Sequence, residues 1–468
     1  METLLYTQTD IKILNELKSI CGEKFVLYDE ESLNDYGHDE TEDLVFKPEV
    51  VVKPRTPEEI SAVLKLANQY KIPVTPRGAG TGLSGGALPV HGGIVLSMER
   101  FNSILEIDER NLQCTVETGV INQHLRDAVE AKGLFYPPDP ASRGSCFIGG
   151  NLAECSGGPK AVKYGVTKDY VLNCEVVLPT GEIIWTGANV LKNSTGYNLT
   201  QLMVGSEGTL GVITKVVLKL IPLPTENLLM LVPFLSAEKA CESVSAVFKA
   251  GITPSAMEFM ELDAINFVMK HVDVKIPVKD GVKAHLLIEV DGNDKEVLFK
   301  ECEKITEIMY AYECDEVLFA ESAQQKADLW RARRAVGEAV KSHSVYKEED
   351  TVVPRAALPQ LLKGVKDIGA KYGFRSVCYG HAGDGNLHVN IIKEEMSDAD
   401  WDEKLPHGIT EIFQLCVKLG GTISGEHGIG WVQKNYMGIR FSEVELNLQR
   451  GIKKLFDPLN ILNPSKMF

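Results

Sequence analysis

The sequence predicts an α+β protein that folds as more than one domain, and three observations support this prediction. The chain has 468 residues, which is too long for a single hydrophobic core. From residue 49 onward, its first half alternates short apolar strands and helices with Gly-rich loops. Its second half alternates helices with strands whose spacing suits an antiparallel sheet, so both halves mix the two kinds of element.

The composition indicates a globular protein without nucleic-acid or membrane partners. Hydrophobic residues make up 44% of the chain and charged residues 24%, and a net charge of −16 opposes binding to nucleic-acid phosphates or anionic lipids. The longest apolar stretch, residues 228–235, is far too short to span a bilayer, and the N-terminus lacks the features of a signal peptide. None of the ten cysteines forms a Cys-x-x-Cys pair, which favours buried thiols in a reducing compartment. We therefore expect a cytoplasmic protein.

The first elements lie between residues 50 and 75. Residues 50–52 are three consecutive valines, typical of a short buried strand. A helix then begins at Thr56, which we expect to cap it, with Pro57 in the first turn and Glu59 closing a capping box. Residues 72–75 form the next expected strand.

A Gly-rich loop follows that strand and ends at Gly86. Gly80, Gly82 and Gly85 satisfy the G-x-G-x-x-G pattern of a Rossmann dinucleotide site, but that site needs a helix directly after the glycines. Another strand, at residues 94–96, follows instead, so the sequence argues against the Rossmann interpretation. Successive backbone N–H groups of such a loop can still hold a diphosphate. A flexible surface loop is the weaker alternative, because strands bound the segment closely.

Two further glycine clusters occupy residues 137–165 and 205–211, and the second precedes a predicted strand at residues 212–214. Each cluster alone is weak evidence for a ligand. Three such loops that converge on one molecule would suit a long, phosphate-containing cofactor.

The second half begins with a regular alternation. Residues 228–234, 284–290 and 316–319 have the pattern of strands, and residues 237–250 and 296–310 that of helices. This order, with antiparallel strands, indicates ferredoxin-like packing.

The segment His381-Ala-Gly-Asp-Gly-Asn-Leu-His388 is the strongest functional signal in the chain. Its flanks read as two strands joined by a tight turn at residues 382–386, so the two imidazoles can converge across a hairpin. Roughly forty residues later, Gly425-Glu426-His427-Gly428 adds a carboxylate and a third imidazole. Two histidines and one carboxylate suit a divalent metal with open positions, which leaves His427 as a possible base. The alternative is a hairpin of purely structural importance.

Five segments together carry a specific resemblance to a known family. From about residue 36 to the C-terminus, the chain resembles the vanillyl-alcohol oxidase superfamily, in the branch that contains D-lactate dehydrogenase, the catalytic subunit of glycolate oxidase and D-2-hydroxyglutarate dehydrogenase. The segments are Arg77-Gly78-x-Gly80-Thr81-x-Leu83-x-Gly85-Gly86, Gly149-Gly150-Asn151, Lys163-Tyr164-Gly165, Val176-Val177-Leu178-Pro179-Thr180-Gly181 and Gly205-Ser206-Glu207-Gly208-Thr209-Leu210-Gly211.

The resemblance implies a two-subdomain FAD-binding domain at residues 1–225 and a ferredoxin-like α+β cap at residues 226–418. A C-terminal helical segment, residues 419–468, is expected to return to the FAD domain. FAD is expected to bind noncovalently, because the first loop lacks the histidine to which many relatives attach it.

The resemblance also implies roles for individual residues. His381, His388 and Glu426 would bind one metal ion, zinc, iron(II) or manganese, and His427 would be the catalytic base. Arg333 and Lys347 would hold the substrate carboxylate, and Asn390, on the same strand face as His388, would contact the substrate or support the metal. The residues expected to contact FAD are Pro76, Arg77, Gly78, Ala79, Gly80, Thr81, Gly82, Leu83, Ser84, Asp139, Ser142, Gly149, Gly150, Asn151, Ser156, Gly157, Gly158, Tyr164, Gly165, Glu207, Gly211, Ile213 and Asn463.

The function implied is metal-assisted oxidation of a D-2-hydroxy acid, with hydride transfer to FAD. D-lactate is the first choice of substrate, and glycolate and D-2-hydroxyglutarate are alternatives. Electrons would pass to an electron-transfer flavoprotein or an iron–sulfur subunit. A noncatalytic flavin electron-transfer subunit and an oxygen-using oxidase are the other functional alternatives.

Overall fold

The computed structural model describes residues 6–468, which form two compact units. Unit 1 comprises the described part of Met1–Ser156 together with Val166–Leu223 and Glu426–Phe468, and unit 2 comprises Gly157–Gly165 and Pro224–Gly425. Two of the boundaries between the units therefore follow Leu223 and precede Glu426, whereas we expected them after residue 225 and before residue 419. Residues 1–5 lie outside the described residues. They belong to the N-terminal segment for which the sequence predicts no signal peptide.

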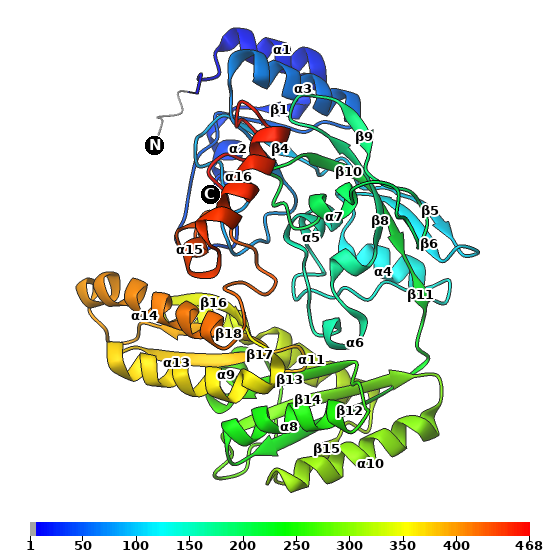
Figure 1. Ribbon diagram of the computed structural model, residues 1–468, viewed down its shortest axis with the longest axis vertical. Helices are drawn as coiled ribbons and strands as arrows, with labels where there is room; N and C mark the ends of the chain where they lie inside the picture. The colour runs from blue at the N-terminus through cyan, green and yellow to red at the C-terminus, as the bar shows by residue number, and fades with distance from the viewer. Residues whose placement is uncertain (1–5) are drawn as a thin grey trace. The chain divides into compact units, whose positions relative to one another are not determined.

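Unit 1 contains two main sheets, which carry the α+β character predicted for the first half (Figure 1). Its helices are α1 (Ile11–Cys21), α2 (Glu30–Asp35), α3 (Pro57–Tyr70), α4 (Asn122–Glu130), α5 (Ile148–Glu154), α7 (Leu199–Met203), α15 (Met437–Arg440) and α16 (Glu443–Phe456). Its strands are β1 (Val26–Leu27), β2 (Val50–Val52), β3 (Val74–Arg77), β4 (Ile94–Ser97), β5 (Ile104–Asp108), β6 (Gln113–Glu117), β7 (Leu134–Phe135), β8 (Val171–Val177), β9 (Ile183–Trp185), β10 (Val212–Lys219) and β11 (Ile221–Pro222).

The first sheet of unit 1 has the order β1-β2-β4-β3, with β2, β4 and β3 parallel. The Gly-rich loop joins β3 directly to β4, so the rejection of a Rossmann site is confirmed: no helix follows these glycines. Thr56 caps α3 as expected, but the predicted capping box is wrong. Glu59 accepts a hydrogen bond from the backbone of Arg55, one residue before the cap.

The second sheet of unit 1 is antiparallel, in the order β5-β6-β10-β8-β9. Val177 and Val212, from β8 and β10, join the buried apolar cluster that packs α1 and α3 on the first sheet. Residues from the end of the chain enter the same cluster, because Leu462 pairs with Val74 beside β3. The C-terminal segment thus returns to this unit and helps to close its core.

Unit 2 is built on one antiparallel sheet of seven strands. Its strands are β12 (Glu226–Phe234), β13 (Ala256–Glu261), β14 (Ala284–Gly292), β15 (Leu318–Phe319), β16 (Tyr346–Val352), β17 (Arg375–His381) and β18 (Asn386–Ile392). Its helices are α6 (Ala161–Tyr164), α8 (Ala237–Lys249), α9 (Leu262–His271), α10 (Lys295–Ala311), α11 (Ala323–Arg334), α12 (Val336–Lys341), α13 (Leu358–Tyr372) and α14 (Asp398–Lys418).

The strand order of this sheet is β15-β12-β14-β13-β17-β18-β16. Helices α8, α10 and α13 pack on one face (Figure 1). Helices α9, α11 and α12 cover the apolar part of the other face. On the second face, Met260, Leu287 and Tyr379 belong to a buried cluster with residues of these three helices. No helix within residues 6–468 is both long and apolar enough to cross a membrane.

The C-terminal segment is held in unit 1 by the fully buried carboxylate of Asp457. It accepts hydrogen bonds from the backbone of Ile461 (3.1 Å) and Leu462 (2.8 Å) and from Nζ of Lys453 (2.6 Å). We predict that Asp457→Ala lowers the free energy of unfolding by roughly 3 kcal/mol, because two backbone N–H groups lose their acceptor and the Lys453 ammonium loses its counter-charge. Equilibrium urea unfolding measures the change.

The matched control is Asp367→Ala. Asp367 also pairs with a lysine four residues away, but both side chains are well exposed. Since an exposed pair of this kind stabilises little, the control should unfold like the unmodified protein. If the two variants lost equal amounts of unfolding free energy, the buried carboxylate of Asp457 would not be what stabilises the C-terminal segment.

Candidate functional site

In unit 2, the hairpin of β17 and β18 carries the two histidines singled out in the sequence. The strand register pairs His381 with Asn386 and His388 with Tyr379, so both imidazoles leave the same face of the sheet. Their ring centroids lie 5.4 Å apart, with the ring planes nearly perpendicular. Both side chains are buried. The sequence pattern therefore does bring the two rings together.

A carboxylate that we did not anticipate fixes the first ring. Nδ1 of His381 lies 2.9 Å from both carboxylate oxygens of Glu258, on β13. Burial opposes ionisation of Glu258, but His381 and Arg333 outweigh it and hold the pKa of this carboxyl below its ordinary value. Because an ionised carboxylate only accepts, Nδ1 of His381 donates to Glu258, and Nε2 is the ring nitrogen that points away from this carboxylate. This is how metal-binding histidines are usually oriented.

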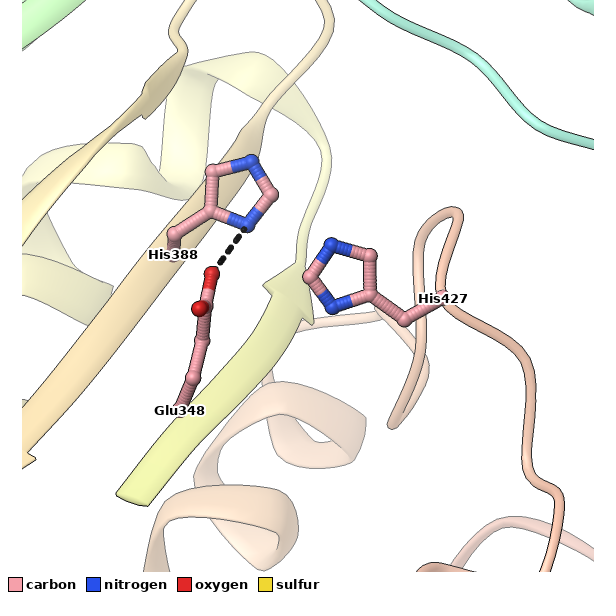
Figure 2. A group of neighbouring side chains, drawn as sticks. All are labelled: Glu348, His388 and His427. Atoms are coloured by element: carbon pink, nitrogen blue, oxygen red, sulfur yellow. Dashed lines mark ion pairs between the residues drawn. The ribbon is translucent and has the colours of Figure 1, made fainter. Parts of the chain in front are cut away.

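Carboxylates also surround the second ring. Nδ1 of His388 lies 3.5 Å from Glu348 and 3.9 Å from Asp350, both on β16. Figure 2 shows the ion pair between His388 and Glu348, and it also draws His427, which is on a loop of unit 1. Glu348 is directly opposite Asn390, and Asp350 is directly opposite His388, so these side chains share one face of the sheet.

Arg333, on α11, belongs to the same group. Only 5% of it is exposed, and its guanidinium lies 2.8 Å from Glu258 and 5.0 Å above the ring of Tyr379. Nε of Arg333 and the amide atoms of the fully buried Asn390 find no hydrogen-bond partner within residues 6–468. Buried polar atoms of this kind are usually satisfied, so they are suited to contact a bound polar molecule.

The structure does not bring Lys347 to this group. Lys347 is opposite Ile391 on the neighbouring strand, one residue out of phase with His388 and Asn390. Since side chains alternate along a strand, it leaves the other face of the sheet. The register therefore places Lys347 on the face opposite to that of His388 and Asn390, whereas the resemblance implies that it holds one carboxylate together with Arg333.

A pocket in unit 1 gathers most of the residues expected to contact FAD. It is lined by Pro76, Arg77, Gly78, Ala79, Gly80, Thr81, Gly82, Leu83, Ser142, Gly149, Gly150, Asn151, Ser156, Glu207, Gly211 and Ile213. All three glycine clusters contribute, as convergence on a single long ligand requires.

Several expected FAD contacts are not part of that lining: Ser84, Asp139, Gly157, Gly158, Tyr164, Gly165 and Asn463. Asp139 pairs instead with Arg126 and Arg143, and Asn463 donates hydrogen bonds to two backbone carbonyls. The remaining glycines and Tyr164 belong to the segment Gly157–Gly165 of unit 2, where the Tyr164 hydroxyl donates to Asp291.

Two residues from the Gly-Glu-His-Gly motif, Glu426 and His427, line the same pocket of unit 1. The sequence resemblance assigned them to metal binding and proton transfer, within a C-terminal segment that it expected to return to the FAD domain. Other lining residues that sequence reasoning missed are Gly86, Ala87, Met98, Thr118, Pro140, Ala141, Phe147, Ala153, Glu154, Ser206, Gly208 and Val212. Most of these are neighbours of residues that were predicted, so the glycine clusters were the available signal.

The pocket has the features that an FAD site needs. Gly80 has a φ of +74°, which favours glycine and lets the loop expose successive backbone groups. Nδ2 of Asn151 and Oε2 of Glu154 are buried at the pocket without a hydrogen-bond partner within residues 6–468. A polar ligand such as a flavin nucleotide could satisfy these atoms.

Glu258 is the functional residue that the sequence analysis missed most clearly. Its only local signal is a charged residue inside the apolar run Ala256-Met257-Glu258-Phe259-Met260, where a carboxylate would need a buried partner. The identity of that partner depends on pairing between distant strands.

Comparisons with known proteins agree with this geometry. Residues 48–187 match the family described as FAD binding domain, and residues 223–467 match FAD linked oxidases, C-terminal domain. The chain is 40% identical to glycolate oxidase subunit GlcD of Bacillus subtilis, over 92% of each chain. It is 38% identical to D-lactate dehydrogenase of Anaerostipes hadrus, over 100% of this chain and 99% of that one.

The fold is also similar to that of a solved structure, p-cresol methylhydroxylase with substrate bound. The TM-score is 0.81 at 18% sequence identity, over 97% of this chain and 96% of the other. At this identity the likeness concerns the fold alone. It supports the predicted α+β fold of the vanillyl-alcohol oxidase type.

The pairing of Glu258 with Arg333 leads to a prediction on stability. We expect Glu258→Gln to lower the free energy of unfolding of unit 2 by about 3–5 kcal/mol, because a buried guanidinium loses its counter-charge. The double variant Glu258→Gln/Arg333→Met should recover much of the loss, since it leaves no unpaired charge. Urea unfolding of the single and double variants measures both effects.

Glu411→Gln is the control for this prediction. Glu411 also pairs with a cation of unit 2, but at the surface, with Lys371. It should unfold like the unmodified protein. A double variant no more stable than Glu258→Gln would show that the buried charge pair is not the cause.

Proposed function

The chain is an FAD-linked oxidoreductase that belongs to the vanillyl-alcohol oxidase superfamily, and from that premise we propose that it oxidises a D-2-hydroxy acid, D-lactate to pyruvate. One observation carries the proposal: His427, a possible proton acceptor, lines the pocket formed by the FAD loops. The match to D-lactate dehydrogenase over the full length favours D-lactate. The match to a glycolate oxidase subunit keeps glycolate as the alternative.

The cofactor would bind in unit 1, on the Gly78–Gly82 loop and beside Asn151. When bound, FAD supplies the acceptor for the hydride that leaves C2 of the substrate. The protein has to supply a base for the hydroxyl proton, and His427 is suited to this because a neutral imidazole is available near pH 7. Loss of the hydride and of the proton converts the alcohol carbon into the ketone of a 2-oxo acid.

The hairpin of unit 2 would hold a divalent metal through His381 and His388. Its donor set fits, because Glu258 accepts from Nδ1 of His381, so Nε2 is the ring nitrogen that would bind a metal. Glu426 is proposed as the third ligand on the strength of the sequence resemblance. A bound zinc, iron(II) or manganese ion would supply a Lewis acid that eases ionisation of the substrate hydroxyl.

Arg333 and Asn390 are proposed to orient the substrate. Nε of Arg333 is a donor without an acceptor among the described residues 6–468, and a carboxylate is the natural acceptor for a guanidinium. Asn390 leaves the same sheet face as His388, two residues away, and its amide can both donate and accept. Lys347 is left out of the proposed site, because it leaves the other face.

The two electrons received by FAD have to leave the enzyme before the next turnover. We propose a separate protein acceptor, an electron-transfer flavoprotein or an iron–sulfur subunit. The resemblance to dehydrogenases supports this acceptor over oxygen. A noncatalytic electron-transfer subunit is the less favoured alternative, because such a role gives no reason for a histidine in the FAD pocket.

The function is tested by an anaerobic visible spectrum of the purified protein. Before addition of substrate, we expect the absorption bands of oxidised flavin. D-lactate should bleach them, whereas L-lactate should not, because hydride transfer requires one face of C2. Bleaching by glycolate or D-2-hydroxyglutarate alone would reassign the substrate, and a flavin untouched by all of these acids would contradict the proposed activity.

The role of His427 is tested by His427→Ala. We expect the variant to keep its flavin spectrum while the rate of flavin reduction falls by about 10²- to 10⁴-fold, the usual contribution of a general base. His124→Ala, an exposed histidine on α4 of the same unit, is the control and should reduce flavin at the normal rate. Stopped-flow absorbance measures both rates. An unchanged rate in His427→Ala would exclude it as the base.

A further inference from the structure

The loop that begins with His427 is fastened to unit 1 by the carboxylate of Glu207. Oε1 of Glu207 accepts a hydrogen bond from the backbone N–H of Ile429 (2.7 Å), and Oε2 accepts one from that of Gly430 (2.6 Å). Glu207 is 5% exposed. Both oxygens are therefore used by the two residues that follow His427 and Gly428 in the chain.

We propose that Glu207 is a positioning residue for His427, a role that rests on the proposed function. The sequence resemblance assigns Glu207 to FAD binding. The geometry favours a different role, because each oxygen already accepts a hydrogen bond from the backbone of the loop. A carboxylate is also a poor direct partner for a cofactor that carries two phosphates.

The loop has little freedom to move away from this carboxylate. Gly428 has a φ of +79°, and a Cβ there would lie 2.0 Å from Oε2 of Glu154 and 3.0 Å from Oε1 of Glu207. On the other side, a Cβ on Gly430 would lie 2.2 Å from the carbonyl oxygen of Ser84. The backbone after His427 thus lies between two glutamates and the first Gly-rich loop.

Backbone hydrogen bonds hold the same loop from further directions. Trp431 and Val432 donate to the carbonyl of Ser84 at 2.9 and 3.2 Å, and Met467 donates to that of Gly430 at 2.9 Å. These contacts fix the end of the loop, whereas Glu207 fixes the residues nearest to His427. Removal of the carboxylate should therefore loosen the base and leave the remainder of the loop attached.

Glu207 is itself held rigidly. It has a left-handed backbone conformation, with φ of +51°, and its carbonyl accepts a hydrogen bond of 2.8 Å from Asn463. It also belongs to the glycine cluster 205–211, which lines the pocket together with His427. One short segment thus lines the cofactor site and aligns the catalytic base beside it.

The test compares Glu207→Gln with the unmodified protein. Glutamine keeps the size of the side chain but offers one oxygen instead of two, and its NH₂ group opposes one of the two loop N–H groups. We expect the FAD content and KM to be unchanged, and the rate of flavin reduction by D-lactate to fall about ten- to a hundredfold. Glu207→Asp, which keeps both oxygens, should recover part of the rate.

Hydrogen exchange provides a second measurement that needs no substrate. The backbone amides of residues 429 and 430 should exchange at least tenfold faster in Glu207→Gln, because they lose a carboxylate acceptor. Glu175→Gln is the matched control: Glu175 is a buried glutamate of the same unit whose partners are Thr214 and Lys215. It should change neither the exchange of these amides nor the rate of flavin reduction.

The outcomes separate the positioning role from the proposed function. Normal flavin reduction in Glu207→Gln, or unchanged exchange at residues 429 and 430, would overturn the role of Glu207. Loss of FAD from Glu207→Gln would also overturn it, in favour of direct cofactor binding. An unmodified protein that reduces its flavin with none of the hydroxy acids would contradict the proposed function, while faster exchange in the variant would still support the fastening of the loop.

Discussion

A buried carboxylate that accepts hydrogen bonds from separate chain segments is the interaction on which each part of the site depends. In unit 2, Glu258 of β13 holds a histidine of β17 and an arginine of α11. In unit 1, Glu207 holds the loop after His427, and Asp457 holds the C-terminal segment. Each of these buried carboxylates accepts hydrogen bonds from N–H donors or pairs with cations that surround it. The same donors are thereby fixed in direction, which is what a catalytic site requires.

The proposed chemistry divides its tasks between the two units. Unit 1 contributes the FAD loops together with Glu426 and His427, all of which line one pocket. Unit 2 contributes the paired imidazoles, with Arg333 and Asn390 beside them. The proposed base thus belongs to the unit that contains the FAD loops, and the groups proposed to orient the substrate belong to the other unit.

Much of the fold could be predicted from local sequence signals. Three local patterns determine backbone geometry and could be predicted without a structure. They are the valine run of β2, the Pro at the start of α3 and the Gly-containing turn between β17 and β18. The absence of a helix after Gly85 excluded a Rossmann site for the same reason. Contacts between strands that are distant in the sequence could not be predicted from such patterns. Neither the partner of Glu258 nor the sheet face of Lys347 follows from any local pattern, because both depend on the register of strands far apart in the sequence.

The segment Gly157–Gly165 illustrates what a family motif does and does not determine. Lys163-Tyr164-Gly165 helped to identify the family, and the resemblance assigned Tyr164 and Gly165 to FAD. In the structure, Nζ of Lys163 and the hydroxyl of Tyr164 both donate to Asp291 of β14, at 2.6 and 2.8 Å. The motif thus ties a short segment from the middle of the FAD-binding sequence to the sheet of unit 2. A motif of this kind identifies the fold correctly, because it makes a contact that helps to hold the fold together. Its chemical role has to be read from the partner that it binds.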